Sequence, residues 1–167
     1  MIINPYIFAP TNSAGYLIKD TTDSAAHTGT VNNTLITSYL IPANTFSAGD
    51  WFQQFHFTEK VGTAGANSIR TYINTSASLS GATQLTLLSN TATTLSYRMV
   101  RWNSVKSATE TIINGPTGSI TARDSPANQP FTVSNIDWTV NQYFIIAFQL
   151  FNAADTAYLK GMYLIKT

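Results

Sequence analysis

Short segments in which apolar and polar residues alternate recur from Asn32 to the end of this sequence, roughly every 8 to 15 residues. No stretch repeats apolar residues at the i, i+3, i+4 and i+7 positions that an amphipathic helix requires. Short strands at this spacing are typical of β-sandwiches and barrels. We therefore expect an all-β chain that forms an antiparallel two-sheet sandwich, most simply a jelly roll, over residues 31–167.

The expected strands follow from this alternation and from the turn residues between the segments. Segment 142–151 has little polar alternation, so we expect a central strand that is buried on both faces. The dipeptide of Asn114 and Gly115 predicts a tight hairpin turn. The expected strand ranges are 16–19, 34–41, 51–59, 68–74, 83–89, 93–105, 109–113, 119–122, 131–133, 142–151 and 157–166.

Aromatic residues predict which side of the strand at 51–59 faces the core. Trp51, Phe55 and Phe57 occupy alternate positions and therefore share one face. Three aromatic side chains on one face predict that this face is the core side. Trp51 and Trp138 each begin a strand, and both are expected to anchor the core.

Residues 1–30 differ from the rest of the chain. They contain two prolines and a polar run at 19–24, and only 16–19 has the pattern of a strand. We expect an extended N-terminal arm. One interpretation is a first strand lying on the sandwich, and the other is a segment that attaches the protein to a partner or is exchanged between subunits.

Low charge excludes several classes of protein. Charged residues make up 10% of the chain, and the formal net charge is +1, so there is no field to hold nucleic-acid phosphates. A hydrophobic content of 44% argues against disorder. The apolar runs are too short to insert into a membrane, and residues 1–5 lack the basic start of a secretory signal. The absence of cysteine excludes disulfides and thiolate metal sites and fits assembly in a reducing cytoplasm.

Residues with catalytic chemistry are few and scattered. The two histidines are His27, expected in a solvated loop, and His56, expected on the surface or at an interface. Asp50, Asp124 and Asp155 lie beside turn residues, where hydrogen bonding within the turn explains them. We therefore expect no catalytic residue, no metal ion and no cofactor.

Four residues are candidates for binding a ligand. Arg98, Arg101 and Trp102 form one mixed basic and aromatic cluster, and Tyr72 is expected on a less buried strand face, as is Trp102. Such residues can stack on a sugar or form ion pairs with a neighbouring subunit. The alternative is that they form the core side and the solvent side of ordinary strands.

Segment 40–51, with the sequence LIPANTFSAGDW, resembles a pattern in bacteriophage virion proteins. In those proteins a strand ends in Ile-Pro-Ala-Asn-Thr, a turn carries Gly-Asp, and an alternating apolar strand follows. Segments 70–76 and 79–83 are similar to the next strand and loop, so that the resemblance covers roughly residues 34–90. It implies a jelly-roll module of a tail fibre, head fibre or receptor-binding protein, commonly trimeric. The sequence has no repetitive shaft, which favours a compact appendage, tip or decoration subunit.

These observations predict a non-enzymatic structural protein of a phage virion that is assembled in the host cytoplasm and is able to take part in host adsorption. We expect a homo-oligomer, with a trimer as the first choice, whose subunits bury faces rich in Tyr, Phe and Thr. The arm at 1–30 would contact other virion proteins. One alternative is a lectin-like domain that binds a host glycan. Another is a glycan-degrading enzyme, which needs two facing carboxylates.

Overall fold

Ten β-strands and no helix form the parts of the chain that the computed structural model describes, residues 15–90, 94–114 and 131–167. The strands are β1 (Gly15–Asp20), β2 (Thr34–Ile41), β3 (Trp51–Val61), β4 (Asn67–Asn74), β5 (Thr83–Asn90), β6 (Thr94–Ser107), β7 (Glu110–Asn114), β8 (Phe131–Asn135), β9 (Gln142–Gln149) and β10 (Thr156–Lys166).

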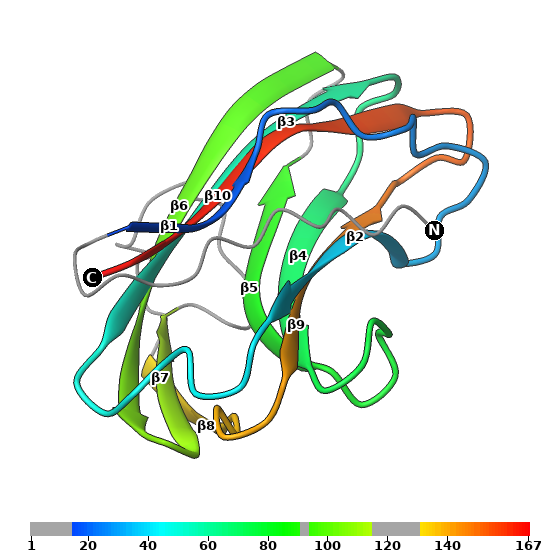
Figure 1. The fold of residues 1–167 in the computed structure, drawn as a ribbon. Helices are drawn as coiled ribbons and strands as arrows, with labels where there is room; N and C mark the ends of the chain where they lie inside the picture. The colour runs from blue at the N-terminus through cyan, green and yellow to red at the C-terminus, as the bar shows by residue number, and fades with distance from the viewer. Residues whose placement is uncertain (1–14, 91–93, 115–130) are drawn as a thin grey trace.

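The strands form two antiparallel sheets that pack face to face (Figure 1). The six-stranded sheet has the order β1-β10-β3-β6-β7-β8, and the four-stranded sheet has the order β2-β9-β4-β5. Strands β1, β10, β3 and β6 of the six-stranded sheet, together with the whole four-stranded sheet, have the arrangement of a jelly roll. The chain passes repeatedly from one sheet to the other. The hairpin of β7 and β8 widens the larger sheet. The expected all-β, antiparallel, jelly-roll-like sandwich is confirmed.

Most strand ranges agree with those expected from the sequence. The strand at 34–41 has the expected bounds, and β9 is a central strand buried on both faces, as predicted. Among the described strands, β7 pairs with β8 through Glu110↔Asn135 to Asn114↔Phe131. The expected strand at 119–122 and the turn at Gly115 lie outside the described residues.

The turn in segment 40–51 has the predicted form. Gly49 has a φ of 92°, a conformation that glycine adopts without the steric cost of a Cβ atom. The Ser47 amide donates to Asp50 Oδ2 at 2.7 Å, and the Asp50 carboxylate also pairs with Lys166 Nζ at 2.7 Å. Turn bonding therefore explains Asp50, as expected, and the turn delivers the chain into β3.

Trp138 anchors the core, as predicted. Its ring centroid lies 4.6 Å from that of Phe46 and 5.8 Å from that of Phe52. Its indole Nε1 donates to Thr111 Oγ1 at 2.9 Å, so that the buried polar atom has a partner. Trp51 differs from the prediction, because 49% of its surface is exposed.

The predicted core side of β3 is wrong. Residues at even positions point inward, from Phe52 through Gln54 and His56 to Thr58 and Lys60, and all five are buried. Counting aromatic residues misassigned the face because polar side chains can also be buried when they find partners inside. The aromatic residues at odd positions therefore lie on the outer surface of the six-stranded sheet.

The described part of the N-terminal segment lies on the sandwich. Strand β1 pairs with β10 and places Leu17 and Ile18 in the core. Further along, the backbones of His27 and Ala157 exchange hydrogen bonds of 2.9 and 3.0 Å. His27 is buried, contrary to the expected solvated loop. Residues 1–14 lie outside the described residues, and the role of the arm in attachment stays a prediction.

Candidate functional site

Aromatic side chains gather on the outer surface of the six-stranded sheet, here named the aromatic face. The register places Trp51 of β3 opposite Ser104 of β6, which pairs with Ile112 of β7 and then with Val133 of β8. One outward row therefore crosses four strands. The aromatic residues that point outward from this sheet are Tyr16, Trp51, Phe55, Phe57, Trp102, Phe131, Tyr158 and Tyr163.

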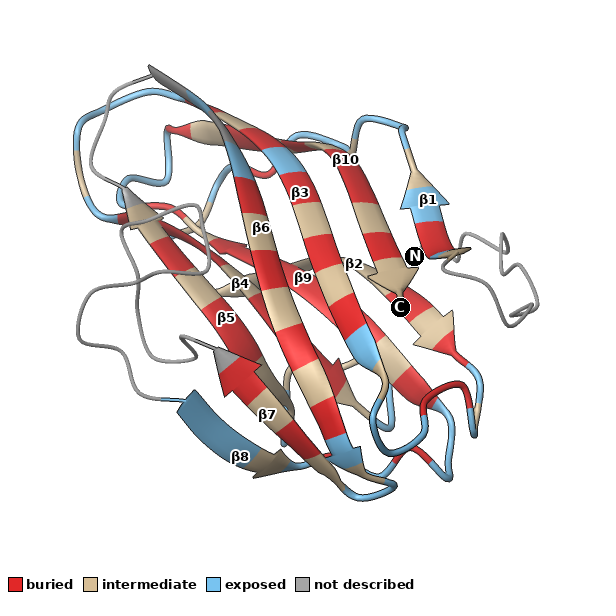
Figure 2. Cartoon of the chain, turned by 90° about the vertical axis from the view of Figure 1, so that its left-hand side faces the viewer, coloured by how far each residue is buried: buried red, intermediate tan, exposed pale blue. Residues whose placement is uncertain are grey.

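This face holds most of the exposed apolar side chains. Nine large apolar side chains of the described residues are more than a third exposed, and six of them lie on it. Figure 2 shows exposed and intermediate bands alternating with buried ones along β3 and β6. The largest apolar patch on a soluble protein is often a functional surface, and large exposed patches mark interaction sites. The six residues and their exposed fractions are Tyr16 51%, Trp51 49%, Phe57 37%, Val61 45%, Phe131 73% and Val133 50%.

Contacts between the rings hold the centre of the face. Phe55 lies 5.8 Å from Phe57 and 6.5 Å from Tyr163, measured between ring centroids. Tyr163 in turn lies 5.5 Å from Tyr16 on the edge strand β1. The Arg98 guanidinium lies 5.8 Å from the Phe55 centroid, a cation–π distance. These rings restrict one another, so that a partner would meet an ordered surface.

The charged end of the face contains an ion-pair network of one ammonium and two carboxylates. Lys160 Nζ lies 2.7 Å from Asp23 Oδ2 and 3.3 Å from Glu59 Oε2. The hydrogen bond to Asp23, aided by Glu59, raises the pKa of Lys160 above its ordinary value. Lys160 therefore stays charged and paired, and it offers little attraction to an added anion.

An open groove of about 460 Å³ lies at the same end of the face. Gly161 is opposite Phe57 in the register, so that β10 presents no side chain directly across from that ring, and Tyr163 of β10 meets it edge-on at 6.4 Å between centroids. Arg98 is exposed on the other side of Phe57 and forms no ion pair with a described residue. The groove thus combines an aromatic wall with one available guanidinium. The described residues that line it are Phe57, Thr58, Glu59, Ser96, Arg98 and Lys160.

The outer surface of the four-stranded sheet is covered by the chain itself. Tyr72 packs there with Ile145 and Ala147, beneath Leu79 and Ala82 from the connection between β4 and β5. Its hydroxyl accepts a hydrogen bond of 2.9 Å from Asn33 Nδ2. Tyr72 is therefore sealed in a small second core, and this face offers no comparable surface to a partner.

Arg101 lies inside the sandwich with a cluster of polar residues. Gln54 Oε1 accepts hydrogen bonds from Thr71 Oγ1 at 2.8 Å and from His56 Nε2 at 3.2 Å, and Arg101 Nη1 donates to the Val100 carbonyl at 2.9 Å. Burial, followed by the positive charge of Arg101, lowers the pKa of His56 to about 3. His56 is thus a neutral core residue, contrary to the expected surface or interface position.

Asp155 takes part in the expected turn through its amide, which donates to the Asn152 carbonyl at 3.0 Å, but its carboxylate forms a buried ion pair. Its Oδ2 lies 3.0 Å from Lys60 Nζ, and both side chains are almost wholly buried. Its Oδ1 accepts from the Thr63 amide at 2.7 Å and from Thr63 Oγ1 at 2.9 Å. Burial acts to raise the pKa of Asp155, but the bonds from Thr63 and Lys60 outweigh it, and the pKa lies below its ordinary value.

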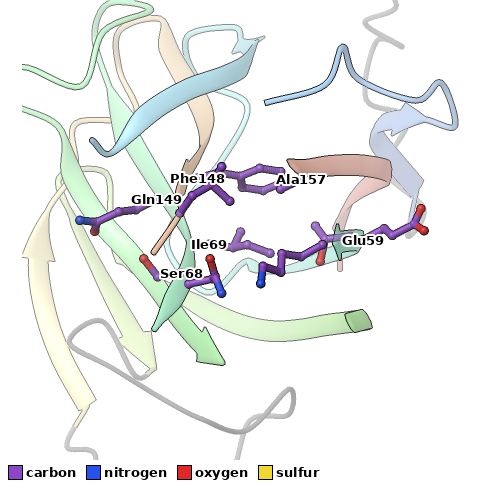
Figure 3. A pocket seen from close by; sticks show the side chains of 10 residues that line it. Glu59, Ser68, Ile69, Phe148, Gln149 and Ala157 are labelled. Atoms are coloured by element: carbon purple, nitrogen blue, oxygen red, sulfur yellow. The ribbon is translucent and has the colours of Figure 1, made fainter. Parts of the chain in front are cut away.

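A small cavity between the sheets near this ion pair is too small for a ligand. It measures about 10 Å³ and is lined by residues of β3, β4, β9 and β10, including Lys60, Ile69 and Phe148 (Figure 3). That volume has room for about one water molecule. It therefore belongs to the packing of the sandwich.

The four residues that the sequence suggested for ligand binding lie in three different parts of the structure. Arg98 and Trp102 lie on the aromatic face, Arg101 is inside, and Tyr72 is sealed under the opposite sheet. Arg98 and Trp102 are four positions apart and share a face, whereas Arg101 points the other way. Sequence reasoning missed the rest of the face because it assigned Trp51, Phe55 and Phe57 to the core.

The described residues offer no metal cluster and no membrane-spanning helix as a further site. Within the described ranges, no group of three or more His, Asp or Glu residues is placed to hold a metal ion. No helix in the described part of the chain is long and apolar enough to span a membrane. Comparisons with protein-family models, curated proteins and solved structures gave no match.

Proposed function

We propose that this protein is a non-enzymatic structural subunit of a phage virion, carried on the particle surface and able to take part in host adsorption. Its activity is association, and the aromatic face is the surface that associates. One observation carries the proposal: six of the nine exposed large apolar side chains of the described residues lie on this face. The chain covers the outer surface of the opposite sheet with its own residues.

The size of the face supports association with another protein. Four strands at a spacing of about 4.8 Å, over about nine residues at 3.3 Å each, make a surface of roughly 19 by 30 Å. The flat area of such a surface, about 570 Å², is roughly seven-tenths of the roughly 800 Å² per partner of a standard interface. Burial of apolar surface stabilises a complex by about 25 cal/mol per Å² before the costs of association are subtracted.

Copies of the same chain are the first proposed partner, with a trimer as the expected oligomer. The resemblance of segment 40–51 to virion proteins supports this choice, and the low charge of the chain fits an interface made by apolar area rather than ion pairs. The N-terminal residues would contact other virion proteins. Assembly in the host cytoplasm fits a chain without cysteine.

Light scattering coupled to size-exclusion chromatography tests the association. We expect the full-length protein to elute as an oligomer at micromolar concentration and Trp51→Lys to shift it to the monomer, because a charge replaces the ring on the face. Phe151→Lys is the matched control, since Phe151 is exposed on a loop away from the face. A wild-type monomer at about 100 μM, far above the Kd of a standard interface, would contradict the proposal.

Immunogold electron microscopy tests the virion assignment separately. Particles of the phage that encodes the chain are purified and labelled with an antibody against it. Label at a regular position on the particles is the expected result. Particles without label, from a lysate that contains the protein, would overturn the assignment but leave the oligomer result intact.

Glycan binding is the second candidate function, and the open groove favours it. Phe57 offers a ring for stacking, and the exposed Arg98 offers hydrogen-bond donors. A glycan array should show binding that Arg98→Ala and Phe57→Ala both weaken; no binding to any glycan would count against this function. Glu59 is the one carboxylate among the described residues lining the groove, and it pairs with Lys160, so the geometry does not favour a glycan-degrading enzyme.

A further inference from the structure

Strand β8 is the outermost strand of the six-stranded sheet, and its side chains are almost entirely exposed. Figure 2 shows it as an exposed strand beside β7, its one partner among the described strands. Phe131 is 73% exposed and Val133 is 50% exposed. Both point to the same side as the aromatic face, because Val133 pairs with Ile112, which pairs with Ser104.

The hydrogen bonds next to β8 identify the backbone groups that face its open edge. Ile136, the residue after β8, donates its amide to the Thr109 carbonyl at 3.1 Å, on the β7 side. Amides along a strand alternate between its two edges, so those of Thr132 and Ser134 also point toward β7. The amide and carbonyl groups of Phe131, Val133 and Asn135 therefore point away from the sheet.

The other three sheet edges carry features that discourage pairing, whereas the described residues of β8 carry no bulge, charge or proline, and only the shortness of the strand protects it. Register irregularities occur in the ladders of β1 with β10, β2 with β9, and β5 with β4, whereas β8 pairs with β7 without interruption. Edge strand β1 also carries Lys19 and Asp20. Segment 131–135 contains no charged residue and no proline. Bulges, charges and prolines are the usual protection of an edge against other chains.

We propose that β8 pairs with β8 of a second copy of this chain, in an antiparallel arrangement around a two-fold axis at Val133. This inference rests on the proposed function, association, and assigns it a second contact. In this register Val133 meets Val133 of the second copy, and Phe131 meets Asn135. These are the residues whose backbone groups face outward, so that about six intermolecular hydrogen bonds form.

A second copy fits this edge because β8 is self-complementary. Side chains at odd positions of β8 point to the aromatic face, and those at even positions point to the inner side. An antiparallel pair around Val133 places odd positions opposite odd positions, so that both copies turn the same side chains to the aromatic face. The uncharged edge offers nothing to a charged partner. Pairing joins two six-stranded sheets side by side, so that their aromatic faces become continuous.

The contact is small, so we expect it to depend on protein concentration. A strand of five residues buries less than the roughly 1,000 Å² of a stable interface. A two-fold contact of this kind joins two chains, so it doubles the mass of a monomer and joins trimers, each with three β8 edges, into larger assemblies.

Hydrogen exchange of the full-length protein, followed by mass spectrometry, tests the pairing. Between about 2 and about 200 μM we expect exchange of the peptide that spans β8 to slow by roughly tenfold or more. Val133→Pro removes an outward amide without removing a bond to β7, and edge strands tolerate proline at such a position. It should abolish this protection and lower the mass at high concentration. The matched control, Val133→Thr, keeps the amide and should retain both.

A face variant separates this inference from the proposed function. Trp51→Lys should leave the concentration-dependent protection of β8 in place, since Trp51 lies on β3, away from the edge. Exchange of β8 that is unaffected by concentration, or protection that Trp51→Lys removes and Val133→Pro does not, would overturn the β8 pairing. The second of these results would leave association through the aromatic face standing. A monomer at every concentration would overturn both.

Discussion

At the scale of single residues, the most consequential contact joins Lys60 and Asp155, which are far apart in the sequence. Gly62 makes the contact possible, because its φ is 139° and a Cβ atom there would lie 2.1 Å from Asp155 Oδ1. Lys60 Nζ also donates to the Thr63 carbonyl. The pair therefore ties the loop after β3 to the start of β10.

Asp155→Asn should destabilise the protein by about 3 kcal/mol at neutral pH, because it removes the Asp155 charge that pairs with the buried Lys60 ammonium. Urea denaturation measures the change in the free energy of unfolding. Asp137→Asn is the control: Asp137 is an exposed turn residue that bonds to Thr139, and its loss should shift the midpoint far less. Equal shifts in the two variants would show that the Lys60–Asp155 pair contributes little.

Acid should remove the contribution of Asp155. Its pKa is lowered in the folded state, so its stabilising effect is complete above the ordinary carboxyl pKa of about 4 and is lost as the pH falls through the folded value. Wild type and Asp155→Asn should therefore converge in stability as the pH is lowered below about 4. A constant difference between the two midpoints down to strong acid would contradict the assignment.

His56 predicts a second, distinct dependence on pH. Its pKa is about 3 in the folded state, whereas the unfolded chain binds the proton near pH 6.5. Between these values the unfolded state binds more protons, so that stability falls by about 1.4 kcal/mol per unit of decreasing pH. His56→Gln should remove this slope, measured as urea midpoints between about pH 6.5 and 4. An unchanged slope would mean that His56 is protonated in the folded protein.

At the scale of elements, β1 shows that the N-terminal segment contributes to the fold. It completes the edge next to β10, and Asp20 Oδ2 accepts a hydrogen bond of 2.9 Å from the Tyr39 hydroxyl across the sandwich. Removal of residues 1–30 would take this strand and its two core side chains away. If residues 1–30 attach the protein to a partner, the same segment also contributes β1 and two core side chains to the fold.

Ile18→Ala measures how much β1 contributes. We expect a loss of about 2–4 kcal/mol, because Ile18 is 4% exposed and its truncation leaves a cavity between the sheets. Lys19→Ala, the next residue and exposed, should change the unfolding free energy by less than about 0.5 kcal/mol. A small effect of Ile18→Ala would mean that β1 detaches readily from β10.

At the scale of the whole molecule, the two outer faces have different consequences. Leu79 and Ala82 pack over the outer cluster of Tyr72, Ile145 and Ala147 on the four-stranded sheet, while no described segment covers the aromatic face of the six-stranded sheet. Of the two outer sheet surfaces, the aromatic face is therefore the one that exposes extensive apolar area for a partner. Association through the aromatic face would remove that apolar area from water, so that a partner would cover the outer surface of the six-stranded sheet.

Salt should have little effect on this association. Lys160, Asp23 and Glu59 are paired with one another near the face, Arg98 is an exception, and the interface is expected to consist mainly of apolar area. Raising the ionic strength from about 0.05 to 0.5 M shortens the Debye length severalfold but should change the Kd by less than tenfold. Sedimentation velocity at the two salt concentrations measures it. Dissociation at high salt would indicate an interface made by ion pairs instead.

The sequence alone determined the strands and the class of fold. Alternation with a period of two and turn residues such as Gly49 are local properties, so that β2, β4 and the central strand β9 were predictable within a residue or two. The sequence also placed Arg98 and Trp102 on one side of β6. These features depend on residues near one another in the chain.

The tertiary structure decided which side of each strand is inside. Alternation defines two faces but does not say which one meets the other sheet, because a shift of one residue exchanges them. The partners that make His56, Arg101 and Asp155 tolerable in the interior come from elsewhere in the fold, as Lys60 does for Asp155. The aromatic face and the open edge of β8 likewise exist only once the strands are ordered into sheets, because exposure is a property of the assembled surface.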